Sequence, residues 1–242
     1  MKKQEKENCI VYKRQEKACE YCFILPKNIM TKYKLGSLIG SGASAAVYEL
    51  IDIKTGTIFA AKFIPFFKED KDSCIRFFEK DFKSELSEIK KMSTLNLGPK
   101  YITDFIIENC TVNNVKCSIG VYVSEKWTTT LHLFKLNTKL DENQILWINT
   151  LLIEEIRKFL RNKLLPRDLH SDNILVRIKN KLVQITFIDT RPVKITRKTL
   201  IDHFVNKEFG PITSLRLFNV LTQSQLESFI IANCLAQTNL IT

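Results

Sequence analysis

The stretch LLPRDLHSDNILV, from Leu164 to Val176, places several charged side chains and one histidine among apolar neighbours. A buried strand would not hold Arg167, Asp168 and Asp172, because an unpaired charge is costly to bury. A fully solvated loop would not need the apolar run that follows at residues 174–176. The combination predicts a polar loop held against an apolar core, which is a common setting for catalytic side chains.

The chain has 242 residues, of which 45% are hydrophobic, enough for one sizeable core or for two small lobes. It contains no run of about 18 consecutive apolar residues, the length that a membrane helix needs. Its first residues, MKKQEKENCIVYKRQEK, are basic but lack the apolar segment of a secretory signal. The seven cysteines are odd in number and scattered, which indicates free thiols in a reducing compartment. We therefore expect a cytoplasmic protein, neither secreted through a signal peptide nor inserted in a membrane.

The formal net charge is +11 and the pI is about 9.3. Such a charge attracts acidic partners and phosphates, but a lysine-rich solubilising surface would give the same value. The interleaved aromatic and basic motifs of common nucleic-acid-binding modules do not occur, so we expect no specific nucleic-acid partner.

Apolar segments bounded by turn residues, such as those at 54–56 and 113–114, occur through much of the first half of the chain and in one later stretch. The segments predicted as strands are 33–52 with a small-residue turn inside it, 57–66, 100–110, 117–125 and the hairpin 173–189.

Steps of three and four between apolar residues predict helices over 73–95 and 142–162, the second with Asp141 as its N-cap. Residues 1–30 are polar, then mixed, and we interpret them as an extension; the last stretch of the chain looks helical or irregular. This order predicts an α+β protein with two unlike lobes, and a cleft between lobes is a common place for a ligand.

The turn in IGSGASAAVY contains Gly40, Gly42 and Ala45 between two predicted strands. Small residues there let backbone N–H groups approach phosphate oxygens closely. Taken alone, the turn could equally be a hairpin with glycines, and it is not a Walker A loop, because no Gly-Lys-Ser/Thr follows.

Lys62 lies in AAKF, inside an apolar strand, where a lysine is costly to bury unless it is paired or faces a cleft. A lysine on the strand after the glycine turn could reach a bound phosphate. The predicted helix that follows offers two carboxylates on nearly the same face, and we favour Glu88 as the partner of Lys62, with Glu85 as the alternative.

The opening stretch supplies Asp168 and Asn173, and TFID places Asp189 at the end of an apolar strand. A loop aspartate can accept a hydroxyl proton. Asparagine and aspartate oxygens suit a hard cation such as Mg2+, although a strand-end aspartate could instead be a turn residue or a helix cap.

In chain order stand a small-residue loop, a strand lysine, a helix glutamate, a polar loop with Asp and Asn, and a strand-end aspartate. These are the residue types that catalyse phosphoryl transfer. The chain resembles a eukaryotic-type protein kinase over residues 33–195. GSGASAAVY resembles the glycine-rich loop, AAK the lysine strand, RDLHSDNIL the catalytic loop, FIDT the metal-binding Asp-Phe-Gly segment, and VYVSEKW the segment that hydrogen-bonds adenine.

The resemblance implies a bilobal protein-kinase-like fold with a β-rich N-lobe over 31–126 and a shortened helical C-lobe over 127–242, after an extension over 1–30. It also implies ATP and Mg2+ as cofactors. The residues that it assigns to the nucleotide are Gly40, Ser41, Gly42, Ala43, Ser44, Val47, Ala60, Lys62, Glu125 and Trp127.

The catalytic roles follow from the same resemblance. Lys62, paired with Glu88, would hold the phosphates of ATP, and Asp168 would be the catalytic base. Asn173 and Asp189 would bind Mg2+. Ser124 would lie at the back of the adenine pocket.

Several positions depart from the family pattern. Ala45 replaces the third glycine but is small enough to allow close approach, and Pro166 replaces a mainly structural histidine, so we expect altered packing there. Thr190 and Arg191 replace Phe-Gly, which makes the usual phenylalanine switch doubtful, and His170 replaces a lysine that helps to neutralise the transferred phosphate.

No Ala-Pro-Glu segment follows Asp189, so we expect the peptide-binding platform to be reduced or absent. Such compaction fits divergent kinases of large DNA viruses or bacterial effectors; a viral protein would act in the host cytoplasm or the virion.

The sequence thus predicts an ATP-dependent kinase that phosphorylates serine or threonine of a protein substrate. Two other functions use the same residues: a pseudokinase or nucleotide-binding interaction module, and a small-molecule or lipid kinase. The basic stretch RPVKITRK, residues 191–198, is either a solvated loop or a guide for acidic partners and substrates.

Overall fold

The computed structural model describes residues 8–14, 17–42, 45–67, 77–112, 115–180 and 182–196. They form an α+β protein with two compact units. The first unit takes the chain up to Lys91 together with Lys100–Lys126, and the second takes Met92–Pro99 together with the chain from Trp127 onward. The chain passes into the second unit at Met92–Pro99, returns to the first, and enters the second again after Lys126.

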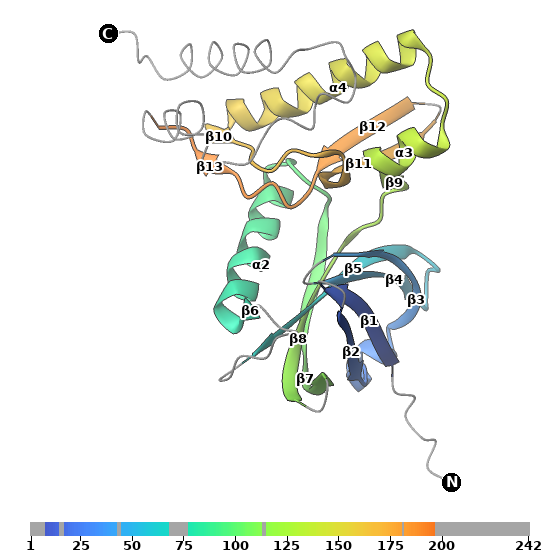
Figure 1. Cartoon of the computed structure of the whole chain (residues 1–242), viewed down its shortest axis with the longest axis vertical. Helices are drawn as coiled ribbons and strands as arrows, with labels where there is room; N and C mark the ends of the chain where they lie inside the picture. Colours follow the sequence, from blue (N-terminus) through green and yellow to red (C-terminus); the bar gives the residue numbers. More distant parts are fainter. Residues whose placement is uncertain are drawn as a thin grey trace. The chain divides into compact units, whose positions relative to one another are not determined.

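One sheet forms most of the first unit, in the strand order β1-β2-β7-β8-β5-β4-β3 (Figure 1). Neighbours in this order are antiparallel, and the short β6 pairs with β5 in parallel. The strands are β1 (Asn8–Arg14), β2 (Lys17–Phe23), β3 (Tyr33–Ser41), β4 (Ala46–Asp52), β5 (Ile58–Phe67), β6 (Phe77–Phe78), β7 (Tyr101–Val112) and β8 (Val115–Glu125). The strands expected in this part of the chain are confirmed as β3, β4, β5, β7 and β8.

Residues 1–30 do not form a separate extension where the structure describes them. β1 and β2 form a hairpin, and β2 continues the sheet by pairing with β7. The short helix α1 (Lys27–Met30) follows, and its Ile29 is buried. The sequence pattern missed these strands because Lys, Arg and Glu interrupt their apolar residues.

The two faces of this sheet have different cores. Residues paired directly across antiparallel strands present their side chains to the same face. One face carries a core that includes Leu50, Phe63 and Val121. The opposite face, which carries Lys62 and Tyr122, packs against helix α2 (Glu79–Thr94).

The helix predicted over 73–95 begins later than expected. Phe77 and Phe78 form β6, and the helix begins at Glu79. The Asp81 side chain, in the first turn of the helix, accepts a hydrogen bond from the Phe78 backbone N–H at 2.8 Å. Residues 68–76, including the expected helix residue Ile75, lie outside the described residues. The apolar stripe itself is confirmed, because Phe82, Leu86 and Ile89 pack into one cluster on the sheet.

The second unit combines helices with two small sheets. β12-β11-β9 form a three-stranded sheet, and β10 pairs with β13. The elements are β9 (Thr129–Thr130), α3 (Leu131–Asn137), α4 (Glu142–Arg161), β10 (Leu164–Leu165), the 3-10 helix η1 (Ser171–Asn173), β11 (Ile174–Lys179), β12 (Leu182–Phe187) and β13 (Val193–Lys194). The hairpin predicted over 173–189 is confirmed as β11 and β12.

Helix α4 begins as predicted at an N-cap. The Asp141 side chain accepts from the Gln144 backbone N–H at 2.8 Å, and the Gln144 side chain accepts from the Asp141 N–H at 3.0 Å. This capping box satisfies two backbone donors that the first turn leaves unpaired. The buried face of α4, including Ile156 and Phe159, packs against β12, and Phe187 of β12 lies 5.7 Å from the Phe159 ring.

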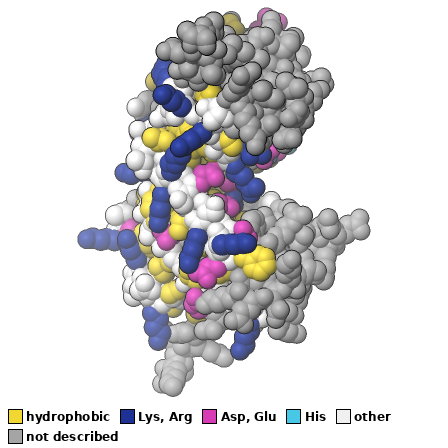
Figure 2. All heavy atoms as spheres, turned by 90° about the vertical axis from the view of Figure 1, so that its left-hand side faces the viewer, with side chains coloured by type: hydrophobic (Ala, Val, Ile, Leu, Met, Phe, Trp, Pro, Cys, Tyr) yellow, Lys and Arg dark blue, Asp and Glu magenta, His cyan; other side chains and the backbone are white. Residues whose placement is uncertain are grey.

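Residues 197–242 lie outside the described residues, so the expectation of helical or irregular structure stays a prediction there. No helix within the described ranges is long and apolar enough to cross a membrane. Figure 2 shows the lysine and arginine side chains of the described surface spread over this face with carboxylates among them, instead of gathered in one stripe.

Candidate functional site

Lys62 lies in the middle of a row of residues that crosses the sheet of the first unit. Val47 of β4 pairs with it on one side and Tyr122 of β8 on the other. All three side chains therefore share the face on which α2 packs. The Lys62 side chain is mostly buried, but 18% of it is exposed to solvent.

The carboxylate that the structure places against Lys62 is Glu85 of α2. Lys62 Nζ and Glu85 Oε1 are 3.0 Å apart, and both side chains are 18% exposed. This ion pair favours the alternative partner, Glu85, over our preferred Glu88. The two glutamates are less than one turn apart, and the sequence pattern did not distinguish which one the helix directs toward β5.

Tyr122 is a member of this cluster that the sequence did not reveal. Its hydroxyl donates to Glu85 Oε1 at 3.4 Å, and Lys62 Nζ lies 5.8 Å from the centre of its ring. The side chain is buried. In VYVSE it had the appearance of an ordinary strand residue, and only the strand register brings it beside Lys62.

The glycine turn lies between β3 and β4, as predicted. The Gly42 N–H donates to the Ala45 carbonyl at 2.9 Å and closes the turn. A Cβ atom added at Gly40 or Gly42 would meet nothing within 4 Å, so protein packing does not demand glycine at either position. Open space above a glycine backbone suits a closely bound phosphate. Ser41 is exposed, and 43–44 lie outside the described residues.

Two further residues expected at the nucleotide lie on the same face of the sheet as Lys62. Val47 pairs directly with Lys62, and Ala60 lies two residues before it on β5. Both side chains are half-buried. Small and branched apolar side chains of this kind can contact a flat heterocycle.

The expected adenine segment belongs to both units, since Lys126 ends its part in the first unit and Trp127 begins its part in the second. In the first unit, the Glu125 N–H donates to the Lys100 carbonyl at 2.8 Å, so this N–H is not available to a base. Lys126 Nζ lies 2.5 Å from Glu49 Oε1 on β4. The hydrogen bond from Lys126 lowers the pKa of Glu49 below its usual value.

In the second unit, Trp127 lies under a guanidinium group. Arg177 of β11 lies 4.2 Å from the centre of the indole ring and is itself oriented by Gln184, which accepts from Arg177 Nε at 2.7 Å. The Trp127 indole nitrogen is buried and meets no hydrogen-bond acceptor in the described part of the chain. The expected role of Trp127 at the nucleotide concerns its backbone and stays a prediction.

The loop between β10 and η1 is held against an apolar core, as its sequence predicted. Leu165, Pro166 and Leu169 are buried, whereas the Asp168 side chain is 64% exposed. Pro166 thus contributes to the core at the position where we expected altered packing.

Backbone hydrogen bonds join this loop to the segment that carries Asp189. The Arg167 N–H donates to the Thr190 carbonyl at 2.8 Å, and the Ile188 N–H donates to the Asn173 carbonyl at 2.9 Å. These two bonds enclose Asp168 on one segment and Asp189 on the other. Three of the predicted residues, Asp168, Asn173 and Asp189, therefore belong to two adjoining loops of one unit.

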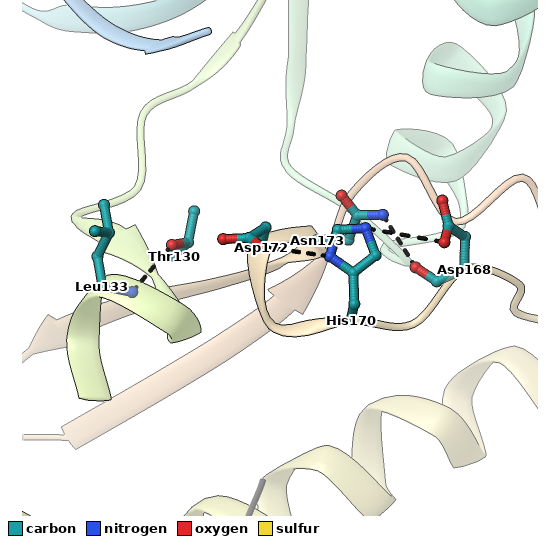
Figure 3. A network of polar contacts seen from close by, with 6 residues as sticks. All are labelled: Thr130, Leu133, Asp168, His170, Asp172 and Asn173. Carbon is teal, nitrogen blue, oxygen red and sulfur yellow. Dashed lines mark hydrogen bonds and ion pairs between the residues drawn. The ribbon is translucent and has the colours of Figure 1, made fainter. Parts of the chain in front are cut away.

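Within the loop, the Asp168 carbonyl is the centre of a small network (Figure 3). It accepts from Asn173 Nδ2 at 3.0 Å and from the His170 N–H at 3.1 Å. The His170 ring lies between two carboxylates, 3.8 Å from Asp168 Oδ1 and 3.6 Å from Asp172 Oδ2. This network fixes the backbone of Asp168 and leaves its carboxylate exposed.

Both candidate aspartates have left-handed backbone conformations, with φ of 52° at Asp168 and 51° at Asp189. Arg191 also has a positive φ, of 38°. Such conformations are uncommon outside glycine, although aspartate adopts them more readily than most residues. Backbone strain of this kind is often found at functional sites.

Asn173 and Asp189, expected to bind Mg2+, carry oxygen atoms of the kinds that this ion prefers. Asn173 uses its amide nitrogen toward Asp168, so its amide oxygen points elsewhere (Figure 3). Amide and carboxylate oxygens, completed by phosphate oxygens and water, are the ligands that Mg2+ prefers. Among the residues that the structure describes, no group of three or more His, Cys, Asp or Glu could hold a metal by itself.

No family model matches the chain, and a comparison with curated proteins finds no match.

Proposed function

We propose that the protein is an ATP-dependent phosphotransferase of the eukaryotic-type protein kinase kind, which transfers the γ-phosphate of ATP to a serine or threonine hydroxyl of a protein. The observation that carries this proposal is the ion pair between Lys62 of β5 and Glu85 of α2. A half-buried lysine held by a helix carboxylate, one strand after a glycine turn, is suited to bind phosphate oxygens.

In this proposal the first unit supplies the nucleotide contacts. The Lys62 ammonium binds phosphate oxygens, while Glu85, which accepts a hydrogen bond from the Tyr122 hydroxyl, holds the ammonium in place. Backbone N–H groups near Gly40 and Gly42 approach the phosphates, and Val47 and Ala60 contact the base. The proposed N-lobe corresponds to this unit.

The second unit supplies the groups for transfer, and the proposed C-lobe corresponds to it. The exposed Asp168 carboxylate accepts the proton of the substrate hydroxyl. Asn173 and Asp189 hold Mg2+, which neutralises phosphate charge when bound. His170, beside Asp168, is the nearest candidate for contact with the transferred phosphate where the kinase pattern has a lysine.

Substitution of the proposed base provides the test. We expect Asp168→Asn to lower transfer of labelled phosphate from Mg-ATP to a protein substrate or to the chain itself by about a hundredfold to ten-thousandfold. Mg-ATP binding, measured by calorimetry, should persist, because Asp168 does not hold the nucleotide. The exposed Asp172→Asn is the matched control, since it removes the same charge from the same loop. Equal transfer by the parent and Asp168→Asn would refute the proposal.

A nucleotide-binding module without catalysis is the second candidate. The observation that favours it is the Thr190 side chain, which is buried after Asp189 where kinases have a mobile phenylalanine. For this function, calorimetry should detect Mg-ATP binding while mass spectrometry of the chain and of candidate substrates finds no added phosphate.

A further inference from the structure

Helix α2 contacts the sheet of the first unit through two ion pairs of opposite polarity. Glu85 pairs with Lys62 of β5, and five residues later Lys90 pairs with Asp104 of β7, with Nζ and Oδ1 2.7 Å apart. The helix therefore directs a negative charge to one strand and a positive charge to another.

The strand partners of these two pairs belong to one row across the sheet. Lys62 pairs with Tyr122, and Tyr122 pairs with Asp104 in the next strand. Two strand spacings separate β5 from β7, or roughly 9.6 Å. The five residues from Glu85 to Lys90 rise about 7.5 Å along the helix. The spacing of the charges on α2 is thus close to the spacing of their partners on the sheet.

The second pair has a third member, Tyr101. Its hydroxyl donates to the same Asp104 oxygen, and Lys90 Nζ lies 5.0 Å from the centre of its ring. Burial would raise the pKa of Asp104, but the hydrogen bonds from Lys90 and Tyr101 outweigh it and lower that pKa below its usual value. The hydrogen bond to Asp104 likewise raises the pKa of Lys90. Both groups are therefore stabilised in their charged forms.

Apolar packing alone would not choose this position of the helix. Phe82 lies flat on Gly120 of β8 and stacks on Phe66 with ring centres 5.7 Å apart. Such contacts hold the helix to the sheet, but the hydrophobic effect is non-directional and tolerates sliding.

The charges do not tolerate sliding. A shift of α2 by one turn in either direction would remove Lys90 from Asp104. The residues that would replace it are uncharged, Ser93 or Thr94 in one direction and Ser87 or Leu86 in the other. Either shift leaves the partly buried Asp104 carboxylate without its lysine, which is unfavourable.

We infer that Lys90, Asp104 and Tyr101 form an internal clamp that fixes α2 in the register where Glu85 meets Lys62, so that this pair forms without an activating partner or a phosphorylated segment. The inference rests on the proposed function, because it concerns the regulation of the same site. The clamp residues are positioning residues: they act on the phosphate-binding lysine through the helix and contact no reacting atom.

Charge reversal tests the clamp in the full chain, purified alone and treated with phosphatase. Lys90→Asp and Asp104→Lys should each weaken Mg-ATP binding by about three- to tenfold, and the double exchange should restore it to within about twofold of the parent. Hydrogen exchange of the α2 amides should rise by about tenfold in each single variant and return in the double variant. Lys83→Asp is the matched control. It makes the same charge change on α2, but Lys83 pairs with Glu79 of the same helix and not with the sheet.

The outcomes separate this inference from the proposed function. If the parent binds no Mg-ATP, the proposed function fails, and hydrogen exchange still reports whether the clamp fixes α2. If the parent binds and transfers but the single reversals leave both α2 exchange and binding unchanged, or the double exchange does not restore them, the clamp is refuted. Transfer that requires an added partner or prior phosphorylation also overturns it.

Discussion

Glu85 and Glu88 lie within one turn of α2, and the choice between them depends on contacts that the sequence does not display. Both flank the apolar stripe of Phe82, Leu86 and Ile89. Residues three apart differ by about 60° around a helix, which is too little to separate them by pattern alone. The structure separates them through the 3.0 Å distance from Glu85 to Lys62.

This difference predicts unequal effects of the same substitution. Glu85→Gln should lower the rate of phosphate transfer by about 10- to 100-fold, because Lys62 loses the carboxylate that orients it. Glu88→Gln should cause a smaller loss under the same conditions. A rate assay with both variants at saturating Mg-ATP measures the ratio, and a larger loss for Glu88→Gln would contradict the assignment.

The packing of α2 on the sheet depends on the absence of one side chain. A Cβ atom added at Gly120 of β8 would lie 2.5 Å from the Phe82 ring, closer than atoms can approach. The conformation of Gly120 is not unusual, so the requirement comes from the helix and not from the strand.

We therefore expect Gly120→Ala to lower the free energy of unfolding by about 1–3 kcal/mol, as overpacking does in a well-filled core. Urea unfolding measures this change. Gly42→Ala is the matched control, because its Cβ would meet nothing within 4 Å, and it should unfold close to the parent. Combining Gly120→Ala with Phe82→Leu should recover part of the loss; a loss unaffected by residue 82 would contradict the packing explanation.

At the level of elements, the sequence predicted those with a strong local signal. The strands β3, β4, β5, β7 and β8 were predicted correctly from apolar segments bounded by turns, and α4 from its long helical spacing and its N-cap. The strands β1 and β2 and the start of α2 were missed. In β1 and β2 charged residues interrupt the apolar residues, and Phe78 fits the helical spacing of α2 although it forms a strand with β5.

The prediction of site residues was likewise limited to what local sequence shows. Residue types with a chemical signature, such as Lys62, Asp168 and Asn173, could be picked from the sequence. Tyr122 and the choice of Glu85 depend on the strand register and on the rotation of a helix, which are tertiary properties. Backbone bonds such as Arg167 to Thr190 carry no side-chain signature at all.

For the whole molecule, two buried thiols give a testable dependence of stability on pH. Cys110 and Cys117 pair directly across β7 and β8, and both are free and buried. Burial raises the pKa of each to about 12, from a usual value of 9.0, with the neighbouring thiol adding to the effect at Cys110. In the unfolded chain the thiols lose their protons first, so stability falls as the pH rises from 9 toward 12.

We expect this decline to reach at most about 1.4 kcal/mol per pH unit for each thiol. Urea unfolding between pH 8 and pH 11 measures it, with a reducing agent present to keep the thiols free. The double variant Cys110→Ala with Cys117→Ala should show a shallower slope, whatever its stability at neutral pH. An equally steep slope in the variant would assign the decline to other groups, such as Tyr48, whose pKa burial also raises.

Two main-chain hydrogen bonds, Arg167–Thr190 and Ile188–Asn173, join the loops that carry Asp168 and Asp189. Every amino acid except proline at the two donor positions can make these bonds. Replacement of the side chains at 167 or 190 thus leaves the tie between the aspartates intact. Substitutions at these positions can therefore change the letters of both loops while the backbone keeps the two aspartates at the same spacing.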